Sequence, residues 1–405
     1  MPRRSDRAMR LTDPFPIPYQ GLAPTHKLDW AGMAKKIVRD VLKLAPHERV
    51  ILSANPHCGG AMLEAVREEI QRARAIELAT ILHWTPGVAA LRNPAGCKTD
   101  RDDAAREDAA MQGLFAAADV FIWLQNDWRT KWRGHAVGQS EYLLEAWPGR
   151  SVHFHWFHDP RNPDPDHPAN KAIDRVYQAA VLDLDYAALR RTMDTLVRKM
   201  AGQIVHVSDA AGTDLRFRAT AKFHQNIGDA SRERIANAAS ARDREEEIPC
   251  GALRTIPTIE SVEGTIAIVR DFGFPSAGYG LDVAQFFDKG LRFHFRGGRV
   301  VKVETGGDQA LLDRLWAAQT GDKDRLGEFV LGCNPLLQPV PDSGFQPYYG
   351  FGDAVLRLAI GENIESGGAN RSSLHRWLMF LSATIRANGE TLVENGKLVL
   401  AAKGG

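Results

Sequence analysis

The stretch 48–82, ERVILSANPHCGGAMLEAVREEIQRARAIELATIL, decides the fold class of this chain. It begins with a short apolar strand and continues through a glycine turn into a segment whose apolar residues recur at helical spacing. A second apolar strand, IELATILHW at 76–84, follows directly. Strands that alternate with helices in this way indicate a parallel sheet of the α/β type.

The same alternation extends outward from this unit over the first half of the chain. Helices are predicted at 30–44, 101–118 and 138–147, and strands at 119–126 and 150–158. The segment 159–170 is dense in Pro, Asp and Asn, which predicts a surface loop at the end of the sheet. The helix predicted at 185–202 then closes the N-terminal domain.

The pattern changes after this helix to hairpin-like runs with Gly or Asn-Gly turns. Examples are GLRFHFRGGRVVKVETGG at 290–307 and TLVENGKLVL at 391–400, with a helix predicted at 308–321. The sequence therefore predicts an α/β protein with a parallel N-terminal α/β domain and a mostly antiparallel C-terminal α+β domain. The boundary is placed near residue 200, which gives domains of 1–200 and 201–405.

Composition excludes several function classes. The 405 residues are 44% hydrophobic and carry a formal net charge of +1, so neither a disordered chain nor a polyanion-binding protein is indicated, and nucleic acid is not an expected partner. The four cysteines form no C-x-x-C pair, which favours a reducing compartment. No apolar run suits a signal peptide or a membrane span, so we expect a soluble, cytoplasmic protein.

Two motifs of the first half offer candidate ligands, each with an ordinary structural alternative. The turn HCGGAMLE at 57–64 is placed where a phosphate can rest on a helix N-terminus, but it matches neither nucleotide-binding fingerprint. In HFHWFHD, His153 and His155 share a face of the predicted strand, and His158 follows. Imidazoles at this spacing hold Zn, Fe or Cu, whereas a half-buried strand needs no ligand to explain them.

Two charged residues of the second half interrupt apolar segments. Glu328 lies within LGEF, after a predicted helix. Because glutamate side chains are seldom buried, an exposed Glu328 without a functional role is favoured over one that points into a site. Arg357 interrupts the apolar strand VLRLAIG, where a surface arginine and a buried anion-binding arginine are equally consistent with the pattern.

Four stretches of the second half together resemble the aminopeptidase T/S family of metallopeptidases and its relatives, the 2,5-dihydroxypyridine dioxygenases. They are IPCGALRTIPTIESVEGT (248–265), GLRFHFRGGRVVKVETGG (290–307), LGEFVLGCN (326–334) and LAIGENIESGGANRSSLH (358–375). They occur in the family's order, and the first half fits the same architecture. The resemblance implies an aminopeptidase T-like fold, a homodimer and a site between the two domains.

The resemblance also implies metal ligands, most of which this sequence lacks. The peptidases bind two metals, and their first Glu falls on Ala252, their His on Arg357 and their Tyr on Ile364. Their second Glu is matched by Glu328. Their closing His-x-Asp falls on His375 and Trp377, so a dinuclear peptidase site is not expected.

The dioxygenases hold one iron through two histidines and an aspartate. In this comparison Glu328 stands where the first His would be, His375 matches the second, and Trp377 replaces the aspartate. Residues 375 and 377 share a face if this segment is a strand, but an indole cannot ligate a cation. Either another residue completes a site for one divalent Fe or Zn ion, or the site works without metal.

We therefore predict a small-molecule catabolic enzyme that opens or hydrolyses an N-heteroaromatic or cyclic amide substrate. An aminopeptidase-like metallohydrolase and a non-catalytic binding or assembly protein are the alternatives. The predicted catalytic residues are Glu328, His375 and His224, of which Glu328 and His375 are also the candidate metal ligands. Arg357, Trp377 and Asn370 are predicted to bind substrate, Arg357 through a carboxylate and Trp377 by stacking on a planar ring.

Overall fold

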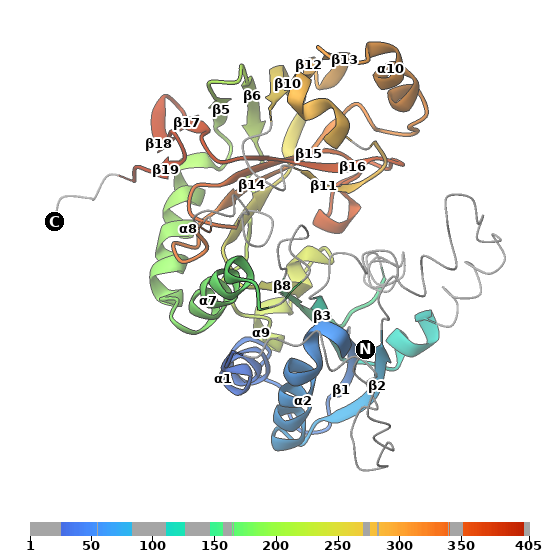
Figure 1. Ribbon diagram of the computed structural model, residues 1–405, viewed down its shortest axis with the longest axis vertical. Helices are drawn as coiled ribbons and strands as arrows, with labels where there is room; N and C mark the ends of the chain where they lie inside the picture. The colour runs from blue at the N-terminus through green and yellow to red at the C-terminus, as the bar shows by residue number, and fades with distance from the viewer. Residues whose placement is uncertain are drawn as a thin grey trace, which may run out of the picture.

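The structure is a computed structural model that describes residues 26–54, 56–82, 111–125, 146–156, 164, 166–269, 276–281, 283–338, 340 and 351–400. It contains three sheets. Figure 1 shows sheet C in the middle of the molecule, with sheet B on one side of it and sheet A on the other. The predicted fold class is confirmed, because sheet A is parallel and sheets B and C are antiparallel.

Sheet A is the parallel sheet predicted from the first half. Its strand order is β2-β1-β3-β4-β8, and every neighbouring pair is parallel. The strands are β1 (Arg49–Ala54), β2 (Ile76–Leu82), β3 (Val120–Gln125), β4 (Arg150–His155) and β8 (Glu245–Ile248). β1 and β4 are almost entirely buried, as expected for strands with both faces covered.

The helices predicted at 30–44 and 185–202 are confirmed, and one further helix is present. The helix predicted at 101–118 is described only at 111–116, and the one predicted at 138–147 lies almost entirely outside the described residues. The helices are α1 (Trp30–Lys35), the π-helical η1 (Lys36–Val41), α2 (Pro56–Arg72), α7 (Pro168–Leu182) and α8 (Tyr186–Met200). The predicted loop 159–170 ends earlier than expected, because α7 begins at Pro168 with His167 as its N-cap. Proline is well accommodated in the first helical turn, so a proline-rich stretch did not exclude a helix there.

Sheet B collects most of the predicted hairpins. Its order is β13-β12-β10-β6-β5-β17-β18-β19. The strands are β5 (Ile204–Ser208), β6 (Asp214–Ala219), β10 (Pro257–Ile268), β12 (Leu291–Arg296), β13 (Arg299–Thr305), β17 (Thr384–Ala387), β18 (Glu390–Glu394) and β19 (Lys397–Leu398). Helix α10 (Gln309–Ala317) is the predicted embedded helix and packs on β13.

Sheet C carries the motifs of the family resemblance. Its order is β11-β16-β15-β14-β9-β7. The strands are β7 (His224–Gln225), β9 (Ala252–Thr255), β11 (Ser276–Tyr279), β14 (Leu326–Gly332), β15 (Leu356–Gly361) and β16 (His375–Phe380). One face of the sheet packs against sheet B, where the rings of Phe329 and Phe217 are 5.5 Å apart. The opposite face is turned toward sheet A (Figure 1).

Sheet A also receives a strand from the second half of the chain. β8 pairs in parallel with β4, although β5, β6 and β7 lie between them in the sequence. Residues on both sides of position 200 therefore build sheet A, and the boundary itself stays a prediction. The short helices α9 (Arg232–Ile235) and η3 (Arg242–Arg244) lead into β8, whereas η6 (Ile364–Ser366) connects β15 to β16.

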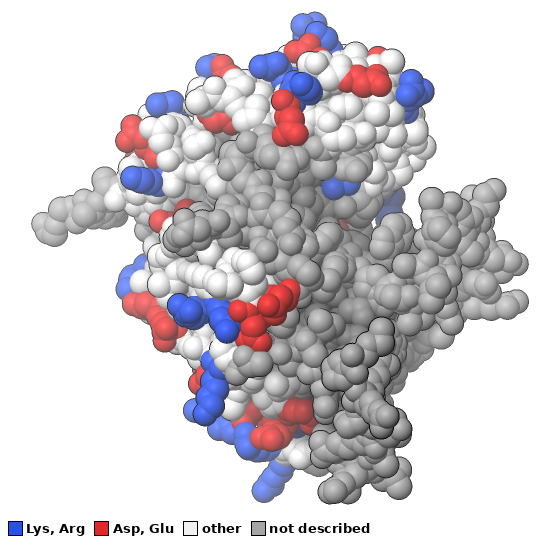
Figure 2. All heavy atoms as spheres, in the orientation of Figure 1, with Lys and Arg blue, Asp and Glu red and all other residues white. Residues whose placement is uncertain are grey.

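The helix lengths and the distribution of surface charge bear on the expected partners. No helix within the described ranges is long and apolar enough to cross a membrane. Figure 2 shows acidic and basic side chains interspersed over the described surface of the face in view. Localisation, oligomeric state and the absence of a nucleic-acid partner stay predictions.

Candidate functional site

The face of sheet C turned toward sheet A brings most of the predicted site residues together. Glu328 pairs with Ala359, Ala359 with Trp377, and Gly361 with His375. Arg254 and Arg357 both pair with Val330, and His224 pairs with Arg254. Directly opposed residues share a face, as do residues two apart along a strand. We call the face that carries His224, Arg254, Glu328, Arg357, His375 and Trp377 the charged face.

Glu328 is buried, so the expectation of an exposed carboxylate is wrong. Its side chain is 1% exposed, and Oε1 accepts a short hydrogen bond from the Ser366 hydroxyl on η6. Its Oε2 is buried without a hydrogen-bond partner among the described residues. A buried carboxylate oxygen is costly to leave unsatisfied, which makes Oε2 a place for water or a ligand.

Arg357 lies on a central strand rather than at the surface. It is 4% exposed, and its guanidinium carbon lies 4.2 Å from the centre of the Trp377 ring and 4.8 Å from that of Phe351. Of the two alternatives left by the sequence, the structure therefore supports the buried arginine. A guanidinium with aromatic rings against it presents its N–H donors in its own plane, the geometry that matches a carboxylate.

His375 and Trp377 share the charged face, as their spacing predicted. Their rings meet edge to face with centroids 5.2 Å apart. The Nδ1–H of His375 donates to the backbone carbonyl of Glu362 at 2.8 Å, so the lone pair of the neutral ring is on Nε2. Burial raises the pKa of the Glu362 carboxyl, and the negative charge of Glu328 raises it further. His375 acts in the opposite direction and lowers it.

The metal-ligand set implied by the resemblance is incomplete on the charged face. Glu328 and His375 share the face, but the third position carries Trp377, and the positive guanidinium of Arg357 lies against that indole. Ala252 and Ile364 add no donor. Among the described residues no three His, Cys, Asp or Glu side chains are grouped to hold a metal ion. These residues do not fit a three-ligand metal site, and the divalent-metal expectation stays a prediction.

Asn370 lies beside the site but is engaged in holding the loop between β15 and β16. Its side-chain amide donates to the carbonyl of Gly361 at 3.2 Å, and its backbone N–H donates to the side chain of Asn363 at 2.9 Å. Both contacts fix the loop that leads to His375. The predicted role of Asn370 in substrate binding stays a prediction.

A cluster of buried ionic side chains lies between the charged face and two histidines of sheet A, His153 and His155. His153 Nε2 lies 2.9 Å from Glu245 Oε2, and His155 Nε2 lies 3.7 Å from Glu247 Oε1. Glu247 also makes a short ion pair with Arg254 of sheet C. Burial lowers the pKa of His155 well below its usual value, an effect to which the His153 ring adds. His158 lies outside the described residues.

Arg242 on η3 completes the cluster. Its guanidinium contacts Glu245 at short range, lies 3.4 Å from Glu247, and lies 2.7 Å from Glu365 on η6. Sequence reasoning missed Arg242, Arg254, Glu245, Glu247 and Glu365. The available signal was the run REEEIP, in which three glutamates enter a short strand beside an apolar segment.

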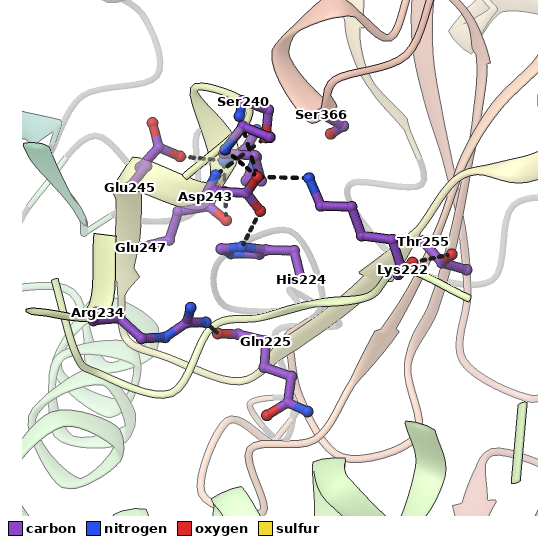
Figure 3. A network of polar contacts seen from close by, with 12 residues as sticks. Lys222, His224, Gln225, Arg234, Ser240, Asp243, Glu245, Glu247, Thr255 and Ser366 are labelled. Carbon is purple, nitrogen blue, oxygen red and sulfur yellow. Dashed lines mark hydrogen bonds and ion pairs between the residues drawn. The ribbon is translucent and has the colours of Figure 1, made fainter. Parts of the chain in front are cut away.

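His224 lies at the edge of sheet C, on β7, and is 8% exposed. Figure 3 shows its ring beneath Asp243, whose Oδ1 is 3.9 Å from Nδ1. Burial lowers the pKa of His224 to about 4, although Asp243 raises it, so the ring is neutral at pH 7. The predicted catalytic residues Glu328, His375 and His224 thus share one face of one sheet.

Two solved structures have the same fold over most of this chain. The first is 2,5-dihydroxypyridine dioxygenase from Pseudomonas putida KT2440, with a TM-score of 0.57, 16% identity, and coverage of 92% of this chain and 97% of that one. The second is wild-type AmpT from Thermus thermophilus, with a TM-score of 0.57, 14% identity, and coverage of 92% and 99%. No protein-family model matches the sequence, and no curated protein matches it. At these identities the likeness concerns the fold alone, and this chain has the aminopeptidase T-like fold that its motifs implied.

Proposed function

We propose that the protein is an enzyme that hydrolyses a small, planar cyclic amide bearing a carboxylate, bound on the charged face of sheet C. The observation that carries this proposal is the buried, unsatisfied Oε2 of Glu328 on the same face as the Arg357–Trp377 stack. A reactive carboxylate, a carboxylate-binding guanidinium and an aromatic surface are three complementary parts of one site.

The register supports binding between Glu328 and Trp377. Ala359 lies between them and pairs with both, so the two large side chains are about 10 Å apart across three strands, with only a methyl group between them. A planar ring placed over Ala359 would contact the indole at one edge and Glu328 at the other. Its carboxylate would then be within reach of Arg357.

In this site Glu328 acts as general base and then as general acid. Its carboxylate takes a proton from water, and the water oxygen bonds to the carbonyl carbon of the amide. The ring C–N bond breaks, and Glu328 returns the proton to the leaving nitrogen. The product is an open-chain amino acid, and the reaction needs no further reactant. The hydroxyl of Ser366 fixes the orientation of the carboxylate throughout.

Calorimetric titration with three probes tests the binding part of the proposal. Nicotinate is planar and anionic, nicotinamide is its neutral analogue, and cyclohexanecarboxylate is anionic but not planar. We expect nicotinate to bind at least roughly tenfold more tightly than either of the others, because a charge-assisted hydrogen bond contributes about 1.5–3 kcal/mol. Arg357→Met should abolish the preference for nicotinate over nicotinamide.

Arg299→Met is the matched control, because Arg299 is an exposed arginine of sheet B paired with Asp324. It should leave the preference unchanged. Equal binding of all three probes, or a preference that survives Arg357→Met, contradicts the proposed site. For the chemistry, ring opening of 6-hydroxynicotinate or its ring-saturated lactam should be lost in Glu328→Gln and should consume no oxygen. Oxygen uptake would support the dioxygenase alternative, and tight binding without turnover would support the non-catalytic one.

A further inference from the structure

A second group suited to proton transfer lies on the charged face at His224. Neither ring nitrogen of His224 has a hydrogen-bond partner among the described residues, and the nearest charged atom given for it is Asp243 Oδ1, 3.9 Å from Nδ1. Nδ1 and Nε2 flank one carbon of the imidazole, and their N–H or lone-pair directions diverge in the plane of the ring. Since Nδ1 is the nitrogen that lies toward Asp243, Nε2 points in another direction.

Asp243 is fixed by contacts that leave one oxygen for His224. Its Oδ2 accepts hydrogen bonds from Lys222 Nζ at 2.6 Å and from the backbone N–H groups of Ala239 and Ser240, each at 3.1 Å. Burial raises the pKa of Asp243, but His224, Lys222 and Ser240 outweigh burial and hold it well below its usual range. The carboxylate is therefore ionised at every pH at which the protein is used, and Oδ1 is a permanent acceptor.

We propose that Asp243 is a positioning residue that holds His224 in the tautomer with its proton on Nδ1, so that Nε2 is a neutral base on the charged face. A carboxylate attracts an N–H group and repels a nitrogen lone pair, so the ring nitrogen that faces Oδ1 at 3.9 Å is expected to carry the proton. The catalytic use of this dyad rests on the proposed function, whereas the tautomer does not.

The surroundings of His224 favour a neutral base over a permanent cation. Arg254 and Arg242 both lie close enough to disfavour a charged ring, and Asp243 is the group that opposes them. When Nε2 takes the proton of the carboxylic acid that ring opening releases, its O–H bond breaks and a carboxylate forms. The imidazolium formed is then stabilised by Asp243, and the neighbouring arginines stabilise the carboxylate.

The tautomer is measured directly by two-dimensional NMR of protein labelled with ¹⁵N-histidine, at pH 7 and without ligand. The signals of His224 are assigned by their loss in His224→Gln. We expect the shift of a protonated nitrogen at Nδ1 and that of an unprotonated nitrogen at Nε2. In Asp243→Asn the side-chain NH₂ can donate to Nδ1, so the tautomer should invert or become mixed.

Asp229→Asn is the matched control, because Asp229 is a half-buried aspartate that accepts from Ser231 and contacts Lys43. It should leave the His224 signals in the wild-type pattern. A proton on Nε2 in the wild-type protein overturns the inference, as does a retained Nδ1 proton in folded Asp243→Asn. Because the wild-type spectrum decides by itself, an unstable Asp243→Asn variant does not block the test.

This experiment separates the inference from the proposed function. The expected tautomer without selective nicotinate binding would overturn the proposed function and leave the role of Asp243 intact. The opposite tautomer with selective nicotinate binding would overturn the role of Asp243 and leave the proposed function intact.

Discussion

The two faces of sheet C are equally buried but are built from opposite kinds of side chain. On the face toward sheet B, the central row is Phe329, Leu358 and Leu378, all inaccessible to solvent. The neighbouring row on the charged face begins with Glu328 and ends with Trp377, and it is buried to nearly the same extent. Burial alone therefore does not distinguish a structural face from a functional one.

The difference lies in what each face contributes to folding. Apolar burial stabilises by roughly 25 cal/mol per Å², whereas buried ions repay their desolvation only when each is paired. A replacement on the sheet B side should thus change stability, and one on the charged face should change chemistry or ion pairing. The predictions below test this division.

The largest expected effect is a loss of stability from a change on the face of sheet C that packs against sheet B. Phe329→Ala should lower the free energy of unfolding by about 3–5 kcal/mol, because it leaves a cavity against Phe217. Urea unfolding measures the change, and nicotinate affinity measured on the folded variant should be preserved. If the variant has unchanged stability, or if it is folded but no longer binds nicotinate, then the face toward sheet B does not act only in folding, and the proposed difference between the two faces is wrong.

A single change in the ion cluster should cost about 3 kcal/mol. Arg254→Met leaves the Glu247 carboxylate buried without its short-range partner. Adding Glu247→Gln to that variant should restore part of the stability, because it removes a buried charge that has lost its shortest ion pair and keeps the longer contacts to Arg242 and His155. Urea unfolding of the two single variants and the double variant forms the test. Additive losses in the double variant would show that the pair is not coupled as the contacts indicate.

The charged face should also govern the loss of stability in acid. The pKa of His224 is lowered to about 4 in the folded protein, against about 6.5 when unfolded. Between these values the unfolded state binds a proton that the folded state does not, so stability falls as the pH drops from 6.5 to 4. His224→Gln removes this contribution, which is on the order of 2–3 kcal/mol.

The measurement is urea unfolding at several pH values between 4 and 7. The difference in free energy of unfolding between His224→Gln and the wild-type protein should shift in favour of the variant as the pH falls. A difference independent of pH would mean that the pKa of His224 is the same in the folded and the unfolded protein.

The smallest expected effect concerns metal binding. Trp377→Asp places a carboxylate beside His375 on the face that also carries Glu328, which completes three candidate ligands. Affinity for Zn²⁺ or Fe²⁺ should rise by roughly tenfold or more, equivalent to about 1.4 kcal/mol, in calorimetric titration. Trp316→Asp on α10 is the control for the loss of an indole. Unchanged affinity in folded Trp377→Asp would mean that the three positions do not converge on one ion.

Much of the fold could be predicted from the sequence because it depends on local patterns. The period of two placed His375 and Trp377 on one face, and alternating strands and helices gave the parallel sheet. The pairing of β8 with β4 could not be predicted, since the chain first forms β5, β6 and β7 elsewhere. The start of α7 at Pro168 was hidden by the composition of the preceding loop.

The site was less predictable because its decisive contacts join distant segments. One carboxylate oxygen of Glu328 accepts a hydrogen bond from Ser366, and Arg357 is covered by Phe351 and Trp377, so both side chains are buried through contacts with distant segments. Nothing near Arg242 in the sequence indicates that it reaches Glu365 on η6. Sequence patterns predict which face a residue occupies, and only the tertiary contacts determine what it faces.

A crystal structure of the protein with 5-bromonicotinate tests the central claim most directly, because anomalous scattering from bromine locates the ring without ambiguity. The account predicts a bromine peak over Ala359, between Glu328 and Trp377, with the carboxylate of the probe in contact with Arg357. A bound probe elsewhere on the molecule, with the charged face of sheet C filled only by water, would contradict it.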